Sequence, residues 1–390
     1  MEPSPLSVIA RLLGVAIGVI MFGLSLMLLF ACETRTGLAF AIAGLGLGGA
    51  MILGAIAIEQ SSKVWRRAAA SSFGLWAILT IGLWINAPDG RTATSSSVQH
   101  RFSNGQWSFK RHALGNMLPE IDQFRLGFKL VPAIDPLFTR QQGHRLAEWT
   151  SSIYQELEAN PDFNALGSVM PLAYDELWGR EFDCGHYILY QPKRPPSSPS
   201  NPVLVFLHGS GGNFKAYTWV LSQVAEELGM IIIAPTYGMG NWHEPATTNL
   251  IENAIQDARK IADIDLSQIH LMGLSNGGLA VSQAGLHLGK RVRSLCFLSP
   301  VFERMLIGTP EFSALWTGRP VLVVSGKHDD RVPIDYVKAS ADMMSSAKID
   351  VTFTAVEDAD HFLLFSHRQQ VIRAVIEWLR PQLRSTPASS

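Results

Sequence analysis

A serine between glycines is the first candidate for chemistry in this chain. Ser275 stands in the run Gly273-Leu-Ser-Asn-Gly277, after a short apolar stretch and before a helix-like one. A serine at a sharp turn from strand to helix projects its hydroxyl above a sheet, where it can act as a nucleophile. Such a turn crowds its neighbours, so the positions two before and two after the serine favour glycine. A glycine-rich turn with a surface serine is the alternative, because the motif alone is a weak signal.

Two polar side chains that follow later apolar runs could activate this serine. Asp329 lies in the run Gly326-Lys-His-Asp-Asp-Arg-Val-Pro333, and His361 follows the next apolar run. A histidine can take the serine proton and give it to the leaving group, while an aspartate orients the imidazole. The spacing from Gly326 and Pro333 favours Asp329, and Asp330 is the second choice. His361 is favoured among the 11 histidines by its position before the last predicted helix.

A third feature could stabilise the charge that develops on a carbonyl oxygen. The segment His208-Gly-Ser-Gly-Gly-Asn213 follows an apolar run, and a glycine-rich turn there leaves backbone N–H groups free to bind an oxyanion. We expect the N–H of Ser210 or of its neighbour to be one donor and the N–H of Asn276 to be the other. The alternative is an ordinary loop between a strand and a helix. His208 and His243 are expected to be structural or to line the pocket.

Apolar, β-branched runs alternate with amphipathic stretches through the second half of the chain. This alternation predicts a mostly parallel sheet covered by helices on both faces, with the active site beyond the carboxyl ends of the strands. The predicted strands are 186–191, 203–207, 230–234, 269–272, 294–298, 321–325 and 351–356. The predicted helices are 215–228, 248–262, 278–288, 335–346 and 368–383.

Together these motifs resemble the α/β-hydrolase superfamily. The motifs that carry the resemblance are His208-Gly-Ser-Gly-Gly, Gly273-Leu-Ser-Asn-Gly-Gly, the Asp329 segment and Asp360-His361, in the order Ser, Asp, His. The resemblance spans about residues 180–384 and implies a doubly wound sheet, a Ser–His–Asp triad, acyl-enzyme chemistry and no cofactor. The same elbow and acid loop occur in esterases and in prolyl-oligopeptidase-like peptidases, but this chain has no room for the propeller of those peptidases. Residues 1–180 match no family pattern.

Three long uncharged stretches lie near the N-terminus. They cover Leu12–Phe30, Gly37–Ile58 and Ala68–Ala87, and each is long enough to cross about 30 Å of hydrocarbon as a helix. Buried helices of soluble proteins usually carry some charge on one face, and these carry none. We therefore expect three transmembrane helices in an integral, multi-pass membrane protein. Gly-x-x-x-Gly pairs at residues 14 and 18 and at residues 44 and 48 would let helices approach closely.

Basic residues near the spans predict the orientation. Arg11 and the loop Lys63–Arg67 would share one side of the membrane, and only Arg35 lies in the other short loop. The positive-inside rule places the first side in the cytoplasm. The catalytic domain is therefore expected on the non-cytoplasmic side, although basic residues between 91 and 111 oppose this orientation.

The expected domain organisation follows from these features. A membrane region covers residues 1–90, a linker and an uncharacterised segment cover 91–180, the catalytic α/β-hydrolase domain covers 181–384, and a tail covers 385–390. Residues 91–107 are polar and rich in Ser and Thr, which is typical of a linker. A helix is expected at 147–158, and closely spaced prolines predict a loop at 192–202.

Composition limits the classes of partner. Charged residues are 17% of the chain and the net charge is −1, so nucleic-acid binding is not expected. The three cysteines, Cys32, Cys184 and Cys296, form no Cys-x-x-Cys pair and no clustered ligand spacing, so no metal site is expected. Cys184 and Cys296 could pair, but two separate thiols are the favoured interpretation.

These features predict a membrane-anchored serine hydrolase, most simply a carboxylic-ester hydrolase that forms an acyl-enzyme on Ser275. A small-molecule ester or acyl substrate, lipid-like in one version, and the lipid bilayer are the expected partners. A serine peptidase of the same fold, an inactive binding or sensing protein, and a transacylase are the alternatives. The connection 301–320 is long enough for a small helical flap. Its apolar residues could line an acyl pocket or belong to the core: Met305, Leu306, Phe312, Leu315 and Trp316.

Overall fold

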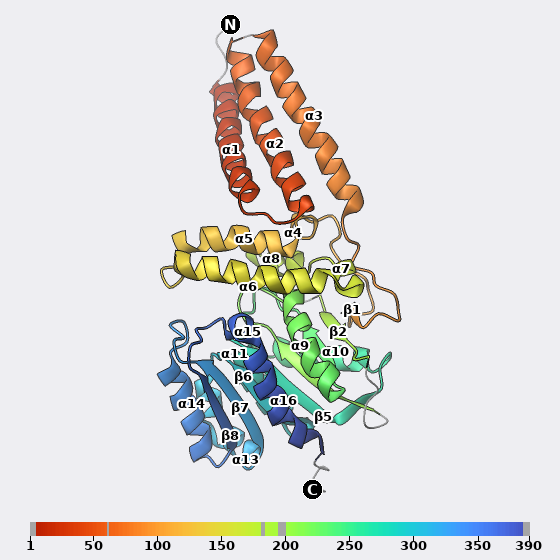
Figure 1. The fold of residues 1–390 in the computed structure, drawn as a ribbon, viewed down its shortest axis with the longest axis vertical. Coiled ribbons are helices and arrows are strands. Elements are labelled where there is room, and N and C mark those ends of the chain that lie inside the picture. The colour runs from red at the N-terminus through yellow and green to blue at the C-terminus, as the bar shows by residue number, and fades with distance from the viewer. Residues whose placement is uncertain (1–4, 61, 181–183, 194–199, 385–390) are drawn as a thin grey trace. The chain divides into compact units, whose positions relative to one another are not determined.

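The computed structural model describes residues 5–60, 62–180, 184–193 and 200–384 (Figure 1). The chain divides into two compact units, one made of residues 1–88 and 111–147 and the other of residues 89–110 and 148–390. Residues 91–180, which we expected to form one segment, are thus shared between both units. The expected tail 385–390 and part of the expected loop 192–202 lie outside the described residues.

Three long helices dominate the first unit, namely α1 (Pro5–Leu29), α2 (Arg35–Gln60) and α3 (Lys63–Asn86). By length and composition all three could cross a membrane, as the sequence predicted. Gly18 and Gly48 allow α1 and α2 to come close, because a Cβ on Gly48 would lie 2.8 Å from the carbonyl oxygen of Gly18. Gly14, by contrast, has nothing within 4 Å of where its Cβ would be, so only part of the first glycine pair serves this contact.

The rest of the first unit is hydrogen-bonded to the turn between α1 and α2. It contains α4 (Leu114–Met117), α5 (Glu120–Leu130), η1 (Val131–Ala133) and the start of α6 (Arg140–Glu158), which continues into the second unit. The Asp122 carboxylate on α5 accepts hydrogen bonds from the N–H groups of Glu33 at 2.7 Å and Thr34 at 3.3 Å. Arg125 donates to the carbonyl oxygen of Ala31 at 2.6 Å. This amphipathic helix therefore satisfies polar groups that α1 and α2 leave open.

An eight-stranded sheet forms the centre of the second unit, in the order β1-β2-β4-β3-β5-β6-β7-β8. Neighbouring strands from β4 to β8 pair in parallel, whereas β2 is antiparallel to both β1 and β4. The mostly parallel sheet predicted from the sequence is confirmed. The strands are β1 (Val98–Phe102), β2 (His186–Tyr190), β3 (Asn201–Leu207), β4 (Ile231–Pro235), β5 (Ile264–Leu274), β6 (Val292–Leu298), β7 (Pro320–Gly326) and β8 (Asp350–Val356).

Helices cover both faces of this sheet, which explains why its central strands read as continuous apolar runs. On one face α10 (Ala246–Ala258), α11 (Gly277–His287) and α14 (Ile334–Ser346) share a buried core with the strands. On the other face α9 (Lys215–Leu228) and α16 (Arg368–Arg384) run side by side (Figure 1). The shorter helices of this unit are α7 (Pro161–Ala165), α8 (Met170–Leu177), η2 (Gly289–Arg291), α12 (Arg304–Ile307), α13 (Pro310–Trp316) and α15 (Leu363–Ser366).

The polar stretch expected as a linker contains an edge strand. β1 pairs antiparallel with β2, with Val98 opposite Tyr190 and Phe102 opposite His186. Val98, His100 and Phe102 are buried, and the residues between them are partly exposed. Linker composition was therefore a wrong guide to residues 98–102, because a strand at the sheet edge needs only alternate positions to be apolar or fully hydrogen-bonded.

The connection expected as a flap holds the short helices α12 and α13. Phe312 and Trp316 are completely buried in the core, so the core interpretation of these two residues is correct and they do not line an acyl pocket. Met305 is 85% exposed. No disulfide joins Cys32, Cys184 or Cys296 in the described part of the chain, in line with the favoured interpretation of separate cysteines.

Candidate active site

The nucleophile candidate lies at the sharp turn between β5 and α11. Ser275 has φ 53°, in the left-handed region that side chains other than glycine rarely adopt. Its N–H donates to the carbonyl oxygen of Leu298 at 2.9 Å, and its own carbonyl oxygen accepts from the N–H groups of Gly278 at 2.8 Å and Val301 at 3.0 Å. These three backbone hydrogen bonds hold the strained residue in place.

Steric crowding explains the flanking glycines. A Cβ on Gly273 would overlap the carbonyl oxygen of Gly277, and a Cβ on Gly277 would overlap the carbonyl oxygen of Leu207 on the neighbouring strand β3. Gly209, in the loop after β3, is equally close to the turn, since its Cβ would lie 3.1 Å from that of Ser275. The glycines thus let two strand ends and one helix start meet around one hydroxyl group.

His361 and Asp329 complete a hydrogen-bonded chain with the serine. His361 Nε2 lies 3.0 Å from Ser275 Oγ, and His361 Nδ1 lies 2.9 Å from Asp329 Oδ2. The carboxylate can only accept from Nδ1, which leaves Nε2 as the acceptor of the serine proton. The structure therefore brings together the three side chains that the sequence singled out, although they lie on three separate loops.

The structure also distinguishes between the two candidate aspartates. The Asp329 side chain is fully buried, and its Oδ1 accepts hydrogen bonds from the N–H groups of Arg331 at 3.0 Å and Val332 at 2.8 Å. Asp330 is exposed. The buried Asp329 carboxylate contacts His361 through Oδ2, so it is the residue that can orient the imidazole.

The two predicted oxyanion donors lie on adjoining loops. Asn276 directly follows the nucleophile, and Ser210 lies in the glycine-rich loop that packs against it through Gly209. Within the described part of the chain, the N–H groups of Ser210 and Asn276 donate no hydrogen bond to another protein group. Both are thus open to a ligand, and their role as an oxyanion hole stays a prediction.

His208 is a structural residue of the same loop. It is fully buried, its Nδ1–H donates to the carbonyl oxygen of Gly209 at 2.8 Å, and its Nε2 accepts from the N–H of Tyr237 at 3.1 Å. Burial lowers the pKa of His208 to about 4, so the ring is neutral at physiological pH. The indole N–H of Trp242 donates to the His208 carbonyl oxygen at 2.9 Å. His243 is exposed, and its ring nitrogens lie 3.0 and 3.2 Å from the hydroxyl of Tyr237.

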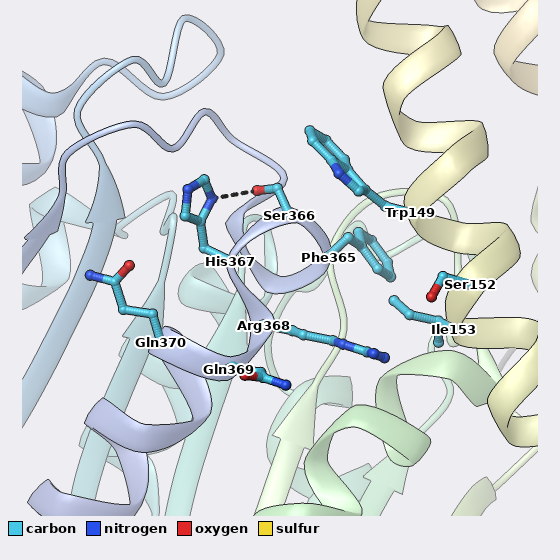
Figure 2. A pocket seen from close by; sticks show the side chains of 9 residues that line it. All are labelled: Trp149, Ser152, Ile153, Phe365, Ser366, His367, Arg368, Gln369 and Gln370. Carbon is cyan, nitrogen blue, oxygen red and sulfur yellow. Dashed lines mark hydrogen bonds between the residues drawn. The ribbon is translucent and has the colours of Figure 1, made fainter.

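A cavity of about 330 Å³ lies between α6 and the start of α16 (Figure 2). Trp149 and Ile153 reach it from α6, and Phe365 faces them from the segment that follows His361. Arg368 extends toward α6 and donates to Glu156 Oε2 at 2.8 Å, which compensates its charge. The cavity wall and the candidate base thus belong to one continuous segment, residues 361–370.

Sequence reasoning missed the residues that support the glycine-rich loop through hydrogen bonds. Tyr237 and Trp242 come from the connection after β4, and Glu176 comes from α8, in a segment for which no role was foreseen. A motif search cannot find such contacts, because the nearest partner of the Glu176 carboxylate, Met239, lies 63 positions away in sequence.

Several solved structures are similar to about half of this chain. Est1E from Butyrivibrio proteoclasticus is 19% identical, with 51% of this chain and 95% of that chain covered at a TM-score of 0.42. An esterase from Pyrobaculum calidifontis is 14% identical, with 51% and 82% covered at a TM-score of 0.41. The acylaminoacyl peptidase of Pyrococcus horikoshii is 15% identical, with 53% of this chain and 40% of that chain covered at a TM-score of 0.42. No family model matches the chain.

Proposed function

We propose that this protein is a membrane-anchored serine hydrolase that cleaves carboxylic esters through an acyl-enzyme on Ser275. The observation that carries the proposal is the chain of two hydrogen bonds from Ser275 Oγ through His361 to the buried carboxylate of Asp329, 3.0 Å and 2.9 Å long. A partly buried, oriented imidazole next to a serine held at an unfavourable φ is the arrangement that nucleophilic catalysis needs. We base the proposal on this geometry and not on the likeness to known esterases.

The proposed reaction follows from the atoms that lie in contact. Ser275 Oγ attacks the ester carbonyl carbon while its proton passes to His361 Nε2, and Asp329 stabilises the imidazolium that results. The N–H groups of Ser210 and Asn276 hold the oxygen that becomes negative. His361 then gives its proton to the leaving alcohol, and the acyl group stays on Oγ. Water repeats the sequence, with His361 as base, and releases the carboxylic acid.

The three long apolar helices are the proposed anchor. Their composition supports three spans, and from the distribution of basic residues we infer that the hydrolase unit lies on the non-cytoplasmic side of the membrane. An ester that partitions into the lipid surface would suit an enzyme held there. Protease accessibility in sealed, oriented vesicles tests the orientation. Digestion of the hydrolase unit from the cytoplasmic face only would reverse it.

A fluorophosphonate probe tests the proposed nucleophile directly. We expect the full chain, purified in detergent or lipid nanodiscs, to be labelled, and Ser275→Ala to lose labelling completely. Ser345→Ala, which removes an exposed hydroxyl on α14, is the matched control and should be labelled like the wild type. Absence of labelling in folded wild-type protein would instead favour an inactive binding or sensing protein.

The bond that is cleaved requires a second measurement. We expect p-nitrophenyl esters of increasing acyl length to be hydrolysed with higher kcat/KM than peptide substrates of matched size. A preference for peptides would support the peptidase alternative. Acyl transfer to an added alcohol or lipid, at the expense of free acid, would identify a transacylase. None of these outcomes changes the predicted role of Ser275, so the probe and the substrate panel answer separate questions.

A further inference from the structure

The glycine-rich loop that carries Ser210 packs against a second loop as well as against the sheet. We define the backing loop as residues 237–242, which follow β4. Gly240 packs so closely on the Gly209–Ser210 peptide that a Cβ on Gly240 would overlap the Gly209 carbonyl oxygen and lie 3.3 Å from the Ser210 nitrogen. Gly211 N–H donates to the carbonyl oxygen of Met239 at 2.9 Å. The position of the Ser210 N–H is therefore set by residues 239 and 240.

One carboxylate accepts hydrogen bonds from the residues of the backing loop on both sides of Gly240. Glu176 Oε2 accepts from the N–H of Met239 at 2.5 Å, and Glu176 Oε1 accepts from the side-chain amide of Asn241 at 2.6 Å. Hydrogen bonds to a charged acceptor are shorter and stronger than hydrogen bonds between neutral groups. A single side chain thus fixes the residues before and after the glycine that supports the Ser210 peptide.

The helix that carries this carboxylate also touches the glycine-rich loop itself. Gly212 has φ 115°, and a Cβ there would lie 2.9 Å from the Cβ of Ala173 and 3.4 Å from the sulfur of Met170, both on α8. Glycine at this position leaves room for α8 and permits the positive φ. α8 therefore braces the loop in two ways, through direct packing at Gly212 and through Glu176 and the backing loop.

We propose that Glu176 is a positioning residue for the oxyanion hole. It acts through Met239 and Gly240 to hold the Ser210 N–H where the developing oxyanion needs it, and it gives a catalytic task to a segment outside the recognised hydrolase motifs. This inference rests on the proposed hydrolase function. An oxyanion donor stabilises the transition state more than the bound ester, so a displaced donor lowers kcat and leaves KM nearly unchanged.

Glu176→Gln tests the proposal because its amide can accept from one of the two donors but not from both. Removal of one oxyanion donor outright costs about 10²–10³ in kcat, and displacement of a donor should cost less, so we expect kcat for p-nitrophenyl butyrate to fall by about 10- to 100-fold. KM should change by less than about threefold. Affinity for an aryl trifluoromethyl ketone, which forms an oxyanion with the nucleophile, should fall in parallel with kcat.

Glu226→Gln is the matched control. Glu226 Oε1 on α9 accepts one backbone N–H, from Lys193 at 3.0 Å, and one side-chain donor, the hydroxyl of Tyr190 at 2.7 Å, so Glu226→Gln removes the same charge at a hydrogen-bonded carboxylate outside the glycine-rich loop. Its kcat and ketone affinity should stay within about threefold of the wild type. If Glu176→Gln is too unstable to assay, Glu176→Asp, which keeps the charge but withdraws it by one methylene, replaces it in the comparison.

The outcomes separate this inference from the proposed function. Parallel losses in kcat and ketone affinity in Glu176→Gln, with wild-type values in the control, support the positioning role. Unchanged kcat and ketone affinity in a folded Glu176→Gln variant, or a loss confined to KM, overturns it while the hydrolase assignment stands. An inactive, unlabelled wild type overturns the proposed function itself.

Discussion

Replacement of Asp329 by asparagine should abolish most activity through the tautomer of His361. Asp329 Oδ1 accepts two backbone N–H groups, from Arg331 and Val332, and Oδ2 lies 2.9 Å from His361 Nδ1. The single amide oxygen of an asparagine can face either the two backbone N–H groups or His361, but not both. With its NH2 toward the two N–H groups it would leave two buried donors unsatisfied, at about 1–3 kcal/mol each, so the oxygen stays there and the NH2 faces His361.

That orientation forces the wrong proton arrangement on the imidazole. His361 Nδ1 must then accept from the amide, so the ring proton moves to Nε2, the atom that should receive the proton of Ser275. A bias of only 2 kcal/mol leaves the productive tautomer populated about 1 part in 30, and the loss of negative charge beside the imidazolium adds to this. We expect kcat to fall by about 10⁴-fold, as in other triads altered in this way, which corresponds to about 5.5 kcal/mol.

Steady-state hydrolysis of p-nitrophenyl butyrate by wild type, Asp329→Asn and Asp330→Asn tests this reasoning. The Asp330→Asn variant controls for loss of charge one position away at an exposed site, and its kcat should stay within about threefold of wild type. The melting temperatures of both variants should be measured alongside. A folded Asp329→Asn protein that keeps more than a tenth of wild-type kcat, or a larger loss in Asp330→Asn, would refute the tautomer argument.

Two further predictions concern stability. Gly277→Ala should destabilise the fold by about 3 kcal/mol or more, because its Cβ would overlap the Leu207 carbonyl oxygen. Gly127→Ala is the control, because a Cβ there meets nothing within 4 Å. Equal denaturant midpoints for the two variants would contradict this prediction. Burial lowers the pKa values of His100 and His208 to about 4, so unfolded chains bind more protons than folded ones between pH 6.5 and 4. The free energy of unfolding should therefore decrease as the pH is lowered through that window, by about 2 kcal/mol per histidine at pH 5. A free energy of unfolding that is equal at pH 7.5 and pH 5 would contradict this prediction.

The central strands and the proximity of Ser275, Asp329 and His361 could be predicted because two regularities act together. Strands buried on both faces read as apolar runs, and parallel strands put the residues that follow them at one edge of the sheet. The predicted helix 215–228 matches α9 in both bounds, since its amphipathic pattern has sharp ends and Gly229 follows with φ 66°. β5 begins at residue 264 rather than 269, because polar residues interrupt the apolar run at Asp265, Ser267 and Gln268, and this first part pairs with β3 only at Asn201.

Contacts between distant segments set the limit of prediction. The pattern around residue 329 offers two neighbouring aspartates, and only the backbone N–H groups of Arg331 and Val332 decide which carboxylate turns inward. β1 could not be recognised from apolar content, since its central residue is a histidine. His100 can be buried there because both ring nitrogens are hydrogen-bonded, at 2.9 Å to His186 and 2.8 Å to the carbonyl oxygen of Leu166.

The proton positions in that buried pair can be assigned in only one way. The Leu166 carbonyl oxygen can only accept, so His100 Nε2 carries a proton and His100 Nδ1 accepts from His186 Nε2–H. His186 Nδ1 must then accept from the hydroxyl of Thr236 at 2.7 Å, and Thr236 Oγ1 accepts from the side-chain amide of Asn213 at 3.1 Å. Asn213 ends the segment that holds Ser210, so the network runs from the edge strand to the candidate oxyanion loop.

Protonation of either histidine would break this chain of donors and acceptors. A second proton on His100 would place it against the donating Nε2–H of His186, and a second proton on His186 would face the hydroxyl of Thr236, which would have to turn away from its present acceptor. Burial lowers the pKa of both rings, so this cost appears only in acid. The polar residues that precede the hydrolase motifs therefore complete the buried hydrogen bonds of the sheet, and acid should loosen the edge strand and the Asn213 end of the glycine-rich loop together.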